Sequence, residues 1–88
     1  MPFVYILRCR GGSLYTGAAL DPRKRLLQHQ AGTASRYTRA HLPVRLIWVR
    51  RVRTWGQALS EEHRIKRLSR AEKLLLMQSG RRPASRIR

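Results

Sequence analysis

Apolar residues gather in two short runs near the start of the chain. The first run covers residues 3–9 and the second covers residues 14–18. Both contain β-branched or aromatic residues, and the Gly-rich segment between them is typical of a turn, so the two runs predict a β-hairpin. The first run alternates too weakly for a strand with a solvent-facing side, which predicts a strand that is mostly covered.

Helix signals follow the predicted hairpin. Asp21 suits an N-cap, and Pro22 suits the first position of a helix that reaches about Ala31, with Gly32 as its C-terminal stop. Residues 32–41 are basic and polar, and we expect them to form an irregular connection. The next apolar segment, residues 43–52, predicts a third strand.

The rest of the chain predicts two more helices, over residues 55–68 and 70–78, the first capped by Thr54 and the second by Ser69 and ended by Gly80. Residues 81–88 contain four arginines and are expected to form a loose basic tail. The order ββαβαα predicts one domain, residues 1–80, of mixed α/β (α+β) type. Its small three-stranded antiparallel sheet would be flanked by helices.

The charge of the chain indicates its partner. Lys and Arg number 20 against 4 Asp and Glu, a formal net charge of +16 over 88 residues. A polyanion, and first of all nucleic acid, is the expected partner. An anionic membrane surface ranks lower, because the chain has no long Lys-rich amphipathic helix and no apolar stretch of membrane-spanning length. We expect a cytoplasmic protein that is more often monomeric than oligomeric, since copies of it repel each other.

One cysteine, Cys9, excludes an internal disulfide and a zinc finger, and its apolar surroundings predict burial. The few acidic residues are more informative. Asp21 and Glu72 are explained by helix starts, whereas Glu62 lies near the middle of the apolar stripe of residues 55–68. Glu62 then either pairs with Lys66, four residues later, or faces a cleft where it binds a divalent cation.

Two tyrosines, Tyr5 and Tyr15, lie in the predicted hairpin. They share one face of the sheet only if the connecting turn has an odd loop, such as residues 11–13, or a bulge. A phenolate favoured by nearby positive charge could act as a general base. Arg25 and His29 share a face of the next helix and suit phosphate binding and water positioning, although the pair also fits a solvated basic face.

The sequence Val4-Tyr5-Ile6, followed by Tyr15-Thr16-Gly17, resembles the motif pair that names the GIY-YIG endonuclease superfamily. The spacing of Arg25 and His29 resembles the family's first helix, and Glu62 resembles its metal-binding glutamate. The resemblance covers residues 3 to about 77 and is strongest to the small, stand-alone bacterial branch. This sequence differs from the motif pair in having Phe3-Val4 in place of Gly-Ile in the first motif and Thr16 in place of the central Ile in the second. The family's downstream Asn has no counterpart nearer than Gln78.

This resemblance implies a metal-dependent endonuclease that hydrolyses phosphodiester bonds, with DNA the first expectation. Mg²⁺ or Mn²⁺ would bind Glu62, either tyrosine would be the general base, and Arg25 would stabilise the charged phosphate. The implied catalytic residues are Tyr5, Tyr15, Arg25, His29 and Glu62. The implied nucleic-acid contacts are Gly17, Lys24, Arg36 and Lys66. The alternatives are a basic binding module of the same fold with little or no catalysis, and a nuclease subunit that needs a protein targeting partner.

Overall fold

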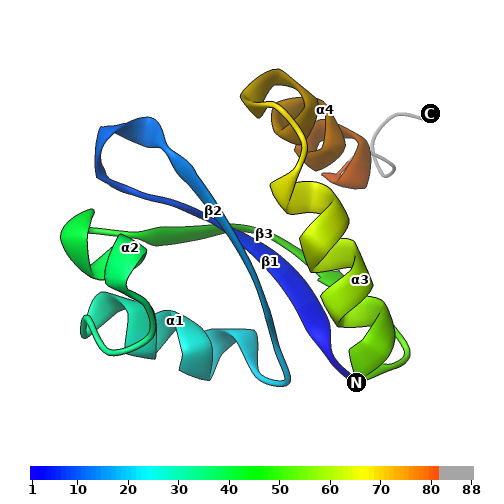
Figure 1. The fold of residues 1–88 in the computed structure, drawn as a ribbon, viewed down its shortest axis with the longest axis horizontal. Coiled ribbons are helices and arrows are strands. Elements are labelled where there is room, and N and C mark those ends of the chain that lie inside the picture. Colours follow the sequence, from blue (N-terminus) through cyan, green and yellow to red (C-terminus); the bar gives the residue numbers. More distant parts are fainter. Residues whose placement is uncertain (82–88) are drawn as a thin grey trace.

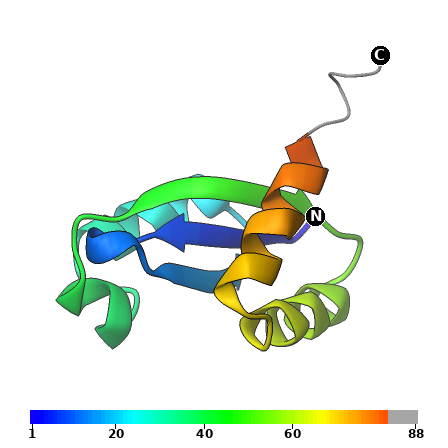
Figure 2. The ribbon, with the colours of Figure 1, turned by 90° about the horizontal axis from the view of Figure 1, so that it is seen from above.

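The computed structural model describes residues 1–81. Its centre is a three-stranded antiparallel sheet in the order β2-β1-β3. The strands are β1 (Phe3–Arg8), β2 (Leu14–Ala19) and β3 (Arg45–Arg51). Helices α1 (Pro22–Gln30) and α2 (Arg36–Ala40) lie on one side of this sheet, and α3 (Trp55–Lys66) and α4 (Arg70–Arg81) lie on the other (Figures 1 and 2). The predicted fold class and the order ββαβαα are confirmed, with α2 as one additional short helix.

The central strand β1 is buried on both faces. Its residues 4–7 are all at most 2% exposed, which explains why the first apolar run does not alternate. One face packs against α3 and α4 in a core of Val4, Ile6, Trp48, Ala58, Ile65 and Met77. The other face packs toward α1 and α2 in a core of Tyr5, Leu7, Cys9, Ala19 and Val44.

The hairpin register puts Tyr5 and Tyr15 on the same face of the sheet. Tyr5 pairs with Gly17, and Leu7 pairs with Tyr15. A three-residue 3-10 turn, η1 (Arg10–Gly12), connects the strands, and its glycines have left-handed φ angles of 84° at Gly11 and 90° at Gly12. The predicted odd loop is confirmed, although it lies one residue earlier than residues 11–13.

The helix starts follow their caps. The Asp21 side chain accepts a hydrogen bond from the Lys24 amide, and Thr54 forms a capping box with Gln57. Two predicted helix ends are wrong. Helix α3 ends at Lys66 rather than Leu68, and α4 continues through Gly80 to Arg81. The predicted tail therefore loses Arg81 to α4, and its remaining residues lie outside the described part of the chain.

The predicted irregular connection contains the short helix α2. Ser35 caps it by accepting a hydrogen bond from the amide of Thr38, which is fully buried. The polar composition of this segment hid the helix, because a single turn has no room for a repeating apolar stripe. Within residues 1–81, no helix combines the length and the apolar character needed to cross a membrane.

Candidate active site

The phenol of Tyr5 lies over Gly17, its partner in the edge strand β2. A Cβ atom at position 17 would come within 2.5 Å of Cζ of Tyr5. Any other residue would therefore displace the Tyr5 ring. Gly17 is one of the implied nucleic-acid contacts, and in the structure its missing side chain leaves room for the Tyr5 ring.

A chain of buried polar groups continues from Tyr5 into α1 and α2. The Tyr5 hydroxyl lies 2.8 Å from Nε2 of His29, and Nδ1 of His29 lies 2.8 Å from Oγ1 of Thr38. Oγ1 of Thr38 in turn lies 2.9 Å from Oγ of Ser35. His29 and Thr38 are both fully buried, so neither side chain is exposed to solvent.

Burial is the largest influence on the pKa values of Tyr5 and His29. Burial raises the pKa of Tyr5 to about 12; the Arg25 guanidinium opposes this rise, and Tyr15 and Glu62 add to it. Burial, and then the positive charge of Arg25, lower the pKa of His29 below its ordinary value. At neutral pH, Tyr5 is therefore a phenol and His29 a neutral imidazole that can accept a proton.

Arg25 extends from α1 toward Tyr5. Gln28, three residues on, accepts a hydrogen bond of 2.9 Å from one terminal nitrogen of Arg25, which orients the guanidinium. The buried Nε of Arg25 has no hydrogen-bond partner within residues 1–81. An orphaned guanidinium donor of this kind fits an anionic oxygen supplied by a ligand. Arg25 and Lys24 also line an open groove of about 420 Å³ that reaches Trp55.

Tyr15 lies between the buried pair and a basic surface. Its ring meets His29 edge-on at 5.2 Å between centroids, and the Lys66 ammonium lies 5.8 Å from the Tyr15 ring centroid. On its outer side Tyr15 stacks at 6.1 Å with Tyr37, which stacks at 4.2 Å with His41. Tyr15 thus starts a short aromatic column that leads from the site to the surface.

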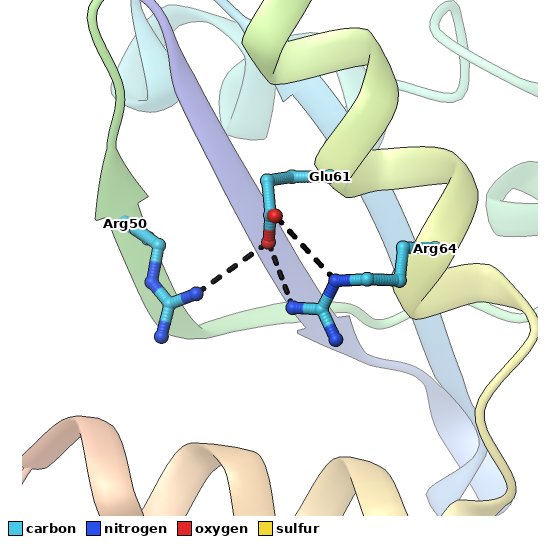
Figure 3. Close-up of polar contacts among 3 residues, drawn as sticks. All are labelled: Arg50, Glu61 and Arg64. Carbon is cyan, nitrogen blue, oxygen red and sulfur yellow. Dashed lines mark hydrogen bonds and ion pairs between the residues drawn. The ribbon is translucent and has the colours of Figure 1, made fainter.

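The two neighbouring glutamates of α3 have different surroundings. Glu61 pairs with Arg64 at 2.8 Å and with Arg50 of β3 at 3.5 Å, so two arginines satisfy its charge (Figure 3). Glu62, with its side chain 20% exposed, pairs with Lys66 at 2.9 Å through Oε2 and lies near enough to influence Tyr5. The ion pair predicted for Glu62 and Lys66 is therefore confirmed, and it forms beside the tyrosines, whereas a cation at Glu62 stays a prediction.

A family profile described as the GIY-YIG catalytic domain matches residues 1–75, nearly the whole described chain. The chain belongs to the GIY-YIG family. A GIY-YIG catalytic domain implies nuclease-like activity on nucleic acid.

Similar proteins come from the small single-domain members of this family. UPF0213 protein SSP2268 of Staphylococcus saprophyticus is 41% identical over 78 residues, which cover 89% of this chain and 95% of the relative. UPF0213 protein OB0043 of Oceanobacillus iheyensis is 43% identical over 76 residues, covering 86% of this chain and 88% of the relative. The solution NMR structure of UPF0213 protein BH0048 from Bacillus halodurans is 35% identical, with a TM-score of 0.60, and the match covers 96% of this chain and 90% of that one.

The expected nucleic-acid contacts of this GIY-YIG domain are spread over its surface. Lys24 lies beside Arg25, and Lys66 lies beside Tyr15. Arg36 is exposed at the start of α2, where it lines a second depression with Arg39. Lys24 and Lys66 are thus close to the catalytic candidates, whereas Arg36 belongs to a separate basic patch.

The carboxylate of Glu62 fits a magnesium-type ion that keeps most of its other ligands as water or phosphate. Within residues 1–81, no three acidic, histidine or cysteine side chains gather into a ready-made metal cluster. Oε2 of Glu62 is engaged by the Lys66 ammonium at 2.9 Å, so a metal ion at this position would displace Lys66. Glu62 is the residue that would hold the metal.

Thr38 and Ser35 are the polar site residues that sequence reasoning missed. Thr38 is a fully buried threonine in a segment without apolar periodicity, so no pattern in the sequence distinguishes it from a loop residue. The spacing Ser-x-x-Thr was the available signal, because a capping serine directs the third residue after it toward the helix start.

Proposed function

We propose that this GIY-YIG protein is a divalent-metal-dependent endonuclease acting on DNA. The observation that carries the proposal is the Tyr5 hydroxyl 2.8 Å from a neutral, buried histidine, beside an arginine whose buried Nε lacks a partner. Tyr5 and His29 together can take up and pass on a proton, and Arg25 can donate hydrogen bonds to a phosphate. These are the two requirements of phosphodiester hydrolysis that side chains supply.

In the proposed reaction, Tyr5 removes a proton from the attacking water while its own proton passes to Nε2 of His29. The water oxygen forms a bond to phosphorus, the bond to the leaving oxygen breaks, and the leaving oxygen takes a proton from solvent. A proton then returns from Nε2 of His29 through Tyr5 to solvent, which restores both side chains. Arg25 donates hydrogen bonds to the phosphate as its negative charge builds. Tyr5 is preferred to Tyr15 as the base because the hydroxyl of Tyr5 contacts a proton acceptor.

Mg²⁺ or Mn²⁺ held by Glu62 would supply Lewis-acid stabilisation of the phosphate charge. Lys66 neutralises Glu62 in the free protein through their 2.9 Å ion pair. With a metal ion on Glu62, Lys66 would be free to contact a substrate phosphate. Lys24 and Arg36 would hold flanking phosphates, so binding is expected to weaken steeply with salt.

A binding module with little catalysis is the second candidate, and the ion pair between Lys66 and Glu62 favours it, because a lysine occupies the expected metal ligand. A nuclease assay separates the two functions. The protein is incubated with Mg²⁺, Mn²⁺ or EDTA and with single-stranded, duplex and branched DNA and with RNA. Cleavage that needs metal and is lost in Tyr5→Phe supports the nuclease, whereas binding without cleavage of any substrate supports the module.

A further inference from the structure

The polar chain behind Tyr5 ends in a part of the fold that the proposed reaction does not use. Thr38 in α2 contacts Nδ1 of His29 at 2.8 Å, on the side of the ring that faces away from Tyr5. Oγ1 of Thr38 also lies 2.9 Å from Oγ of Ser35 and 3.4 Å from the Ser35 carbonyl oxygen. Thr38 is fully buried, so it touches no substrate and acts through His29 alone.

Hydrogen-bond accounting assigns the proton of the imidazole. Within residues 1–81, the one acceptor in contact with the Tyr5 hydroxyl is Nε2 of His29, because the neighbouring Arg25 can only donate. The Tyr5 proton therefore points to Nε2, and the imidazole proton lies on Nδ1, where it is donated to Thr38. The Thr38 hydroxyl can then donate to Ser35, which offers two oxygens. Only this arrangement gives each hydrogen-bond donor of these four side chains an acceptor.

The start of α2 is built differently from the starts of α3 and α4. In those helices the third residue after the cap, Gln57 or Glu72, reaches back to the backbone amide of its cap. In α2 this position is Thr38, whose short side chain contacts His29 instead. Ser35 still caps the Thr38 amide at 3.1 Å, so one serine holds both the backbone and the hydroxyl of Thr38.

We propose that Thr38, supported by Ser35, is a positioning residue that keeps the His29 proton on Nδ1 and so leaves Nε2 free to accept the proton of Tyr5. The effect of Thr38 on catalysis rests on the proposed nuclease function, whereas its effect on which nitrogen of His29 carries the proton does not. Loss of the Thr38 hydroxyl removes the acceptor for Nδ1–H. The tautomer with the proton on Nε2 then becomes competitive, and that tautomer cannot accept from Tyr5.

The direct test is the histidine side-chain ¹H–¹⁵N NMR spectrum of the full chain at neutral pH. His29 in the unmodified protein is expected to be protonated on Nδ1. Thr38→Val keeps the shape of the side chain and is expected to show His29 protonated wholly or partly on Nε2. Thr38→Ser restores a hydroxyl and is expected to return the proton to Nδ1. In the nuclease assay, Thr38→Val should lower kcat about 10- to 100-fold, the loss typical when the outer hydrogen-bond partner of a metal-bound histidine is removed, and Thr38→Ser should recover most of it.

An Nε2-protonated His29 in the unmodified protein would overturn the inference. So would a Thr38→Val protein that keeps both the Nδ1 tautomer and full activity. If Thr38→Val does not fold, Ser35→Ala tests the same series of hydrogen bonds at the Ser35 end. In that variant the His29 proton should shift partly toward Nε2. If no substrate is cleaved at all, the proposed nuclease function fails, while the tautomer spectrum still decides the role of Thr38.

Discussion

The ring of Tyr5 occupies the space that a side chain at position 17 would fill. The two residues are paired across β1 and β2, and a Cβ on Gly17 would lie 2.5 Å from Cζ of Tyr5. This pairing brings the phenol to the edge of the sheet, beside α1, and so to His29 and Arg25. The glycine of the second motif, Gly17, therefore provides the space that the ring of Tyr5 in the first motif requires.

Gly17→Ala should displace the Tyr5 phenol, break its 2.8 Å contact with His29 and abolish activity. Overpacking at a buried site costs about 1–3 kcal/mol, which urea unfolding would detect. Gly56→Ala is the matched control, because Gly56 is exposed in α3 and a Cβ there meets its nearest atom at 3.9 Å. The control should be neutral or slightly stabilised. Equal activity of the two variants would show that the position of Tyr5 does not matter.

The two tyrosines should differ in catalysis. Tyr5→Phe keeps the ring over Gly17 but removes the proton-transfer group, and we expect single-turnover cleavage to fall about 100-fold or more. Tyr15→Phe keeps the edge-on contact with His29 and should reduce the rate less. A larger loss in Tyr15→Phe than in Tyr5→Phe would move the role of base to Tyr15.

Stability should fall as the pH drops below 6.5. The pKa of His29 is lowered from 6.5 by burial and by Arg25, so in this range the unfolded chain binds a proton that the folded chain does not. The stabilisation that results from this difference at His29 is complete above pH 6.5 and is lost as the pH falls through the folded-state pKa. The free energy of unfolding then changes by at most about 1.4 kcal/mol per pH unit. Urea unfolding between pH 5 and 7 should show this slope in the unmodified protein and in the exposed control His63→Gln. A His29→Gln protein with the same slope would contradict this origin.

Thr16 stands at the centre of the second motif, and its hydroxyl is not satisfied. Its side chain is 2% exposed, and Oγ1 has no hydrogen-bond partner within residues 1–81. Thr16 pairs with Ile6, which belongs to the core under α3 and α4, on the face opposite Tyr5. Thr16→Val should therefore raise the free energy of unfolding, by about 1 kcal/mol, with activity unchanged. A destabilised Thr16→Val protein would mean that the hydroxyl has a partner.

Local patterns predicted most of the fold. Asp21, Pro22 and Thr54 marked helix starts, because caps depend on a few adjacent residues. The functional interpretation of Tyr5 and Tyr15 predicted that they share a face, which is confirmed, although the register differs from that of a loop at residues 11–13. Helix ends were less predictable. At Gly80 the chain continues as helix, although glycine lowers helix propensity without preventing a helix.

The candidate site was predictable only as a set of residue types. The family resemblance implied that Tyr5, Arg25, His29 and Glu62 share one site, but it could not show that His29 is buried behind Tyr5. It also could not decide between the partners of the two adjacent glutamates. Glu61 pairs with Arg50, eleven residues away on β3, and this contact depends on how α3 packs against the sheet (Figure 3). Thr38 was missed for the same reason, since its role depends on a contact between α1 and α2.

The adjacent glutamates provide the most direct test of the proposed function. Glu62→Gln and Glu61→Gln make the same chemical change one residue apart on α3, and metal-dependent cleavage of DNA is measured for both under single-turnover conditions. We expect Glu62→Gln to lose activity by about 100-fold or more, since a metal contributes several kcal/mol to such reactions. Glu61→Gln should retain activity, because its ion pairs with Arg50 and Arg64 are structural. Full activity in Glu62→Gln, or equal losses in both variants, would contradict the assignment of Glu62 as the metal ligand of a nuclease.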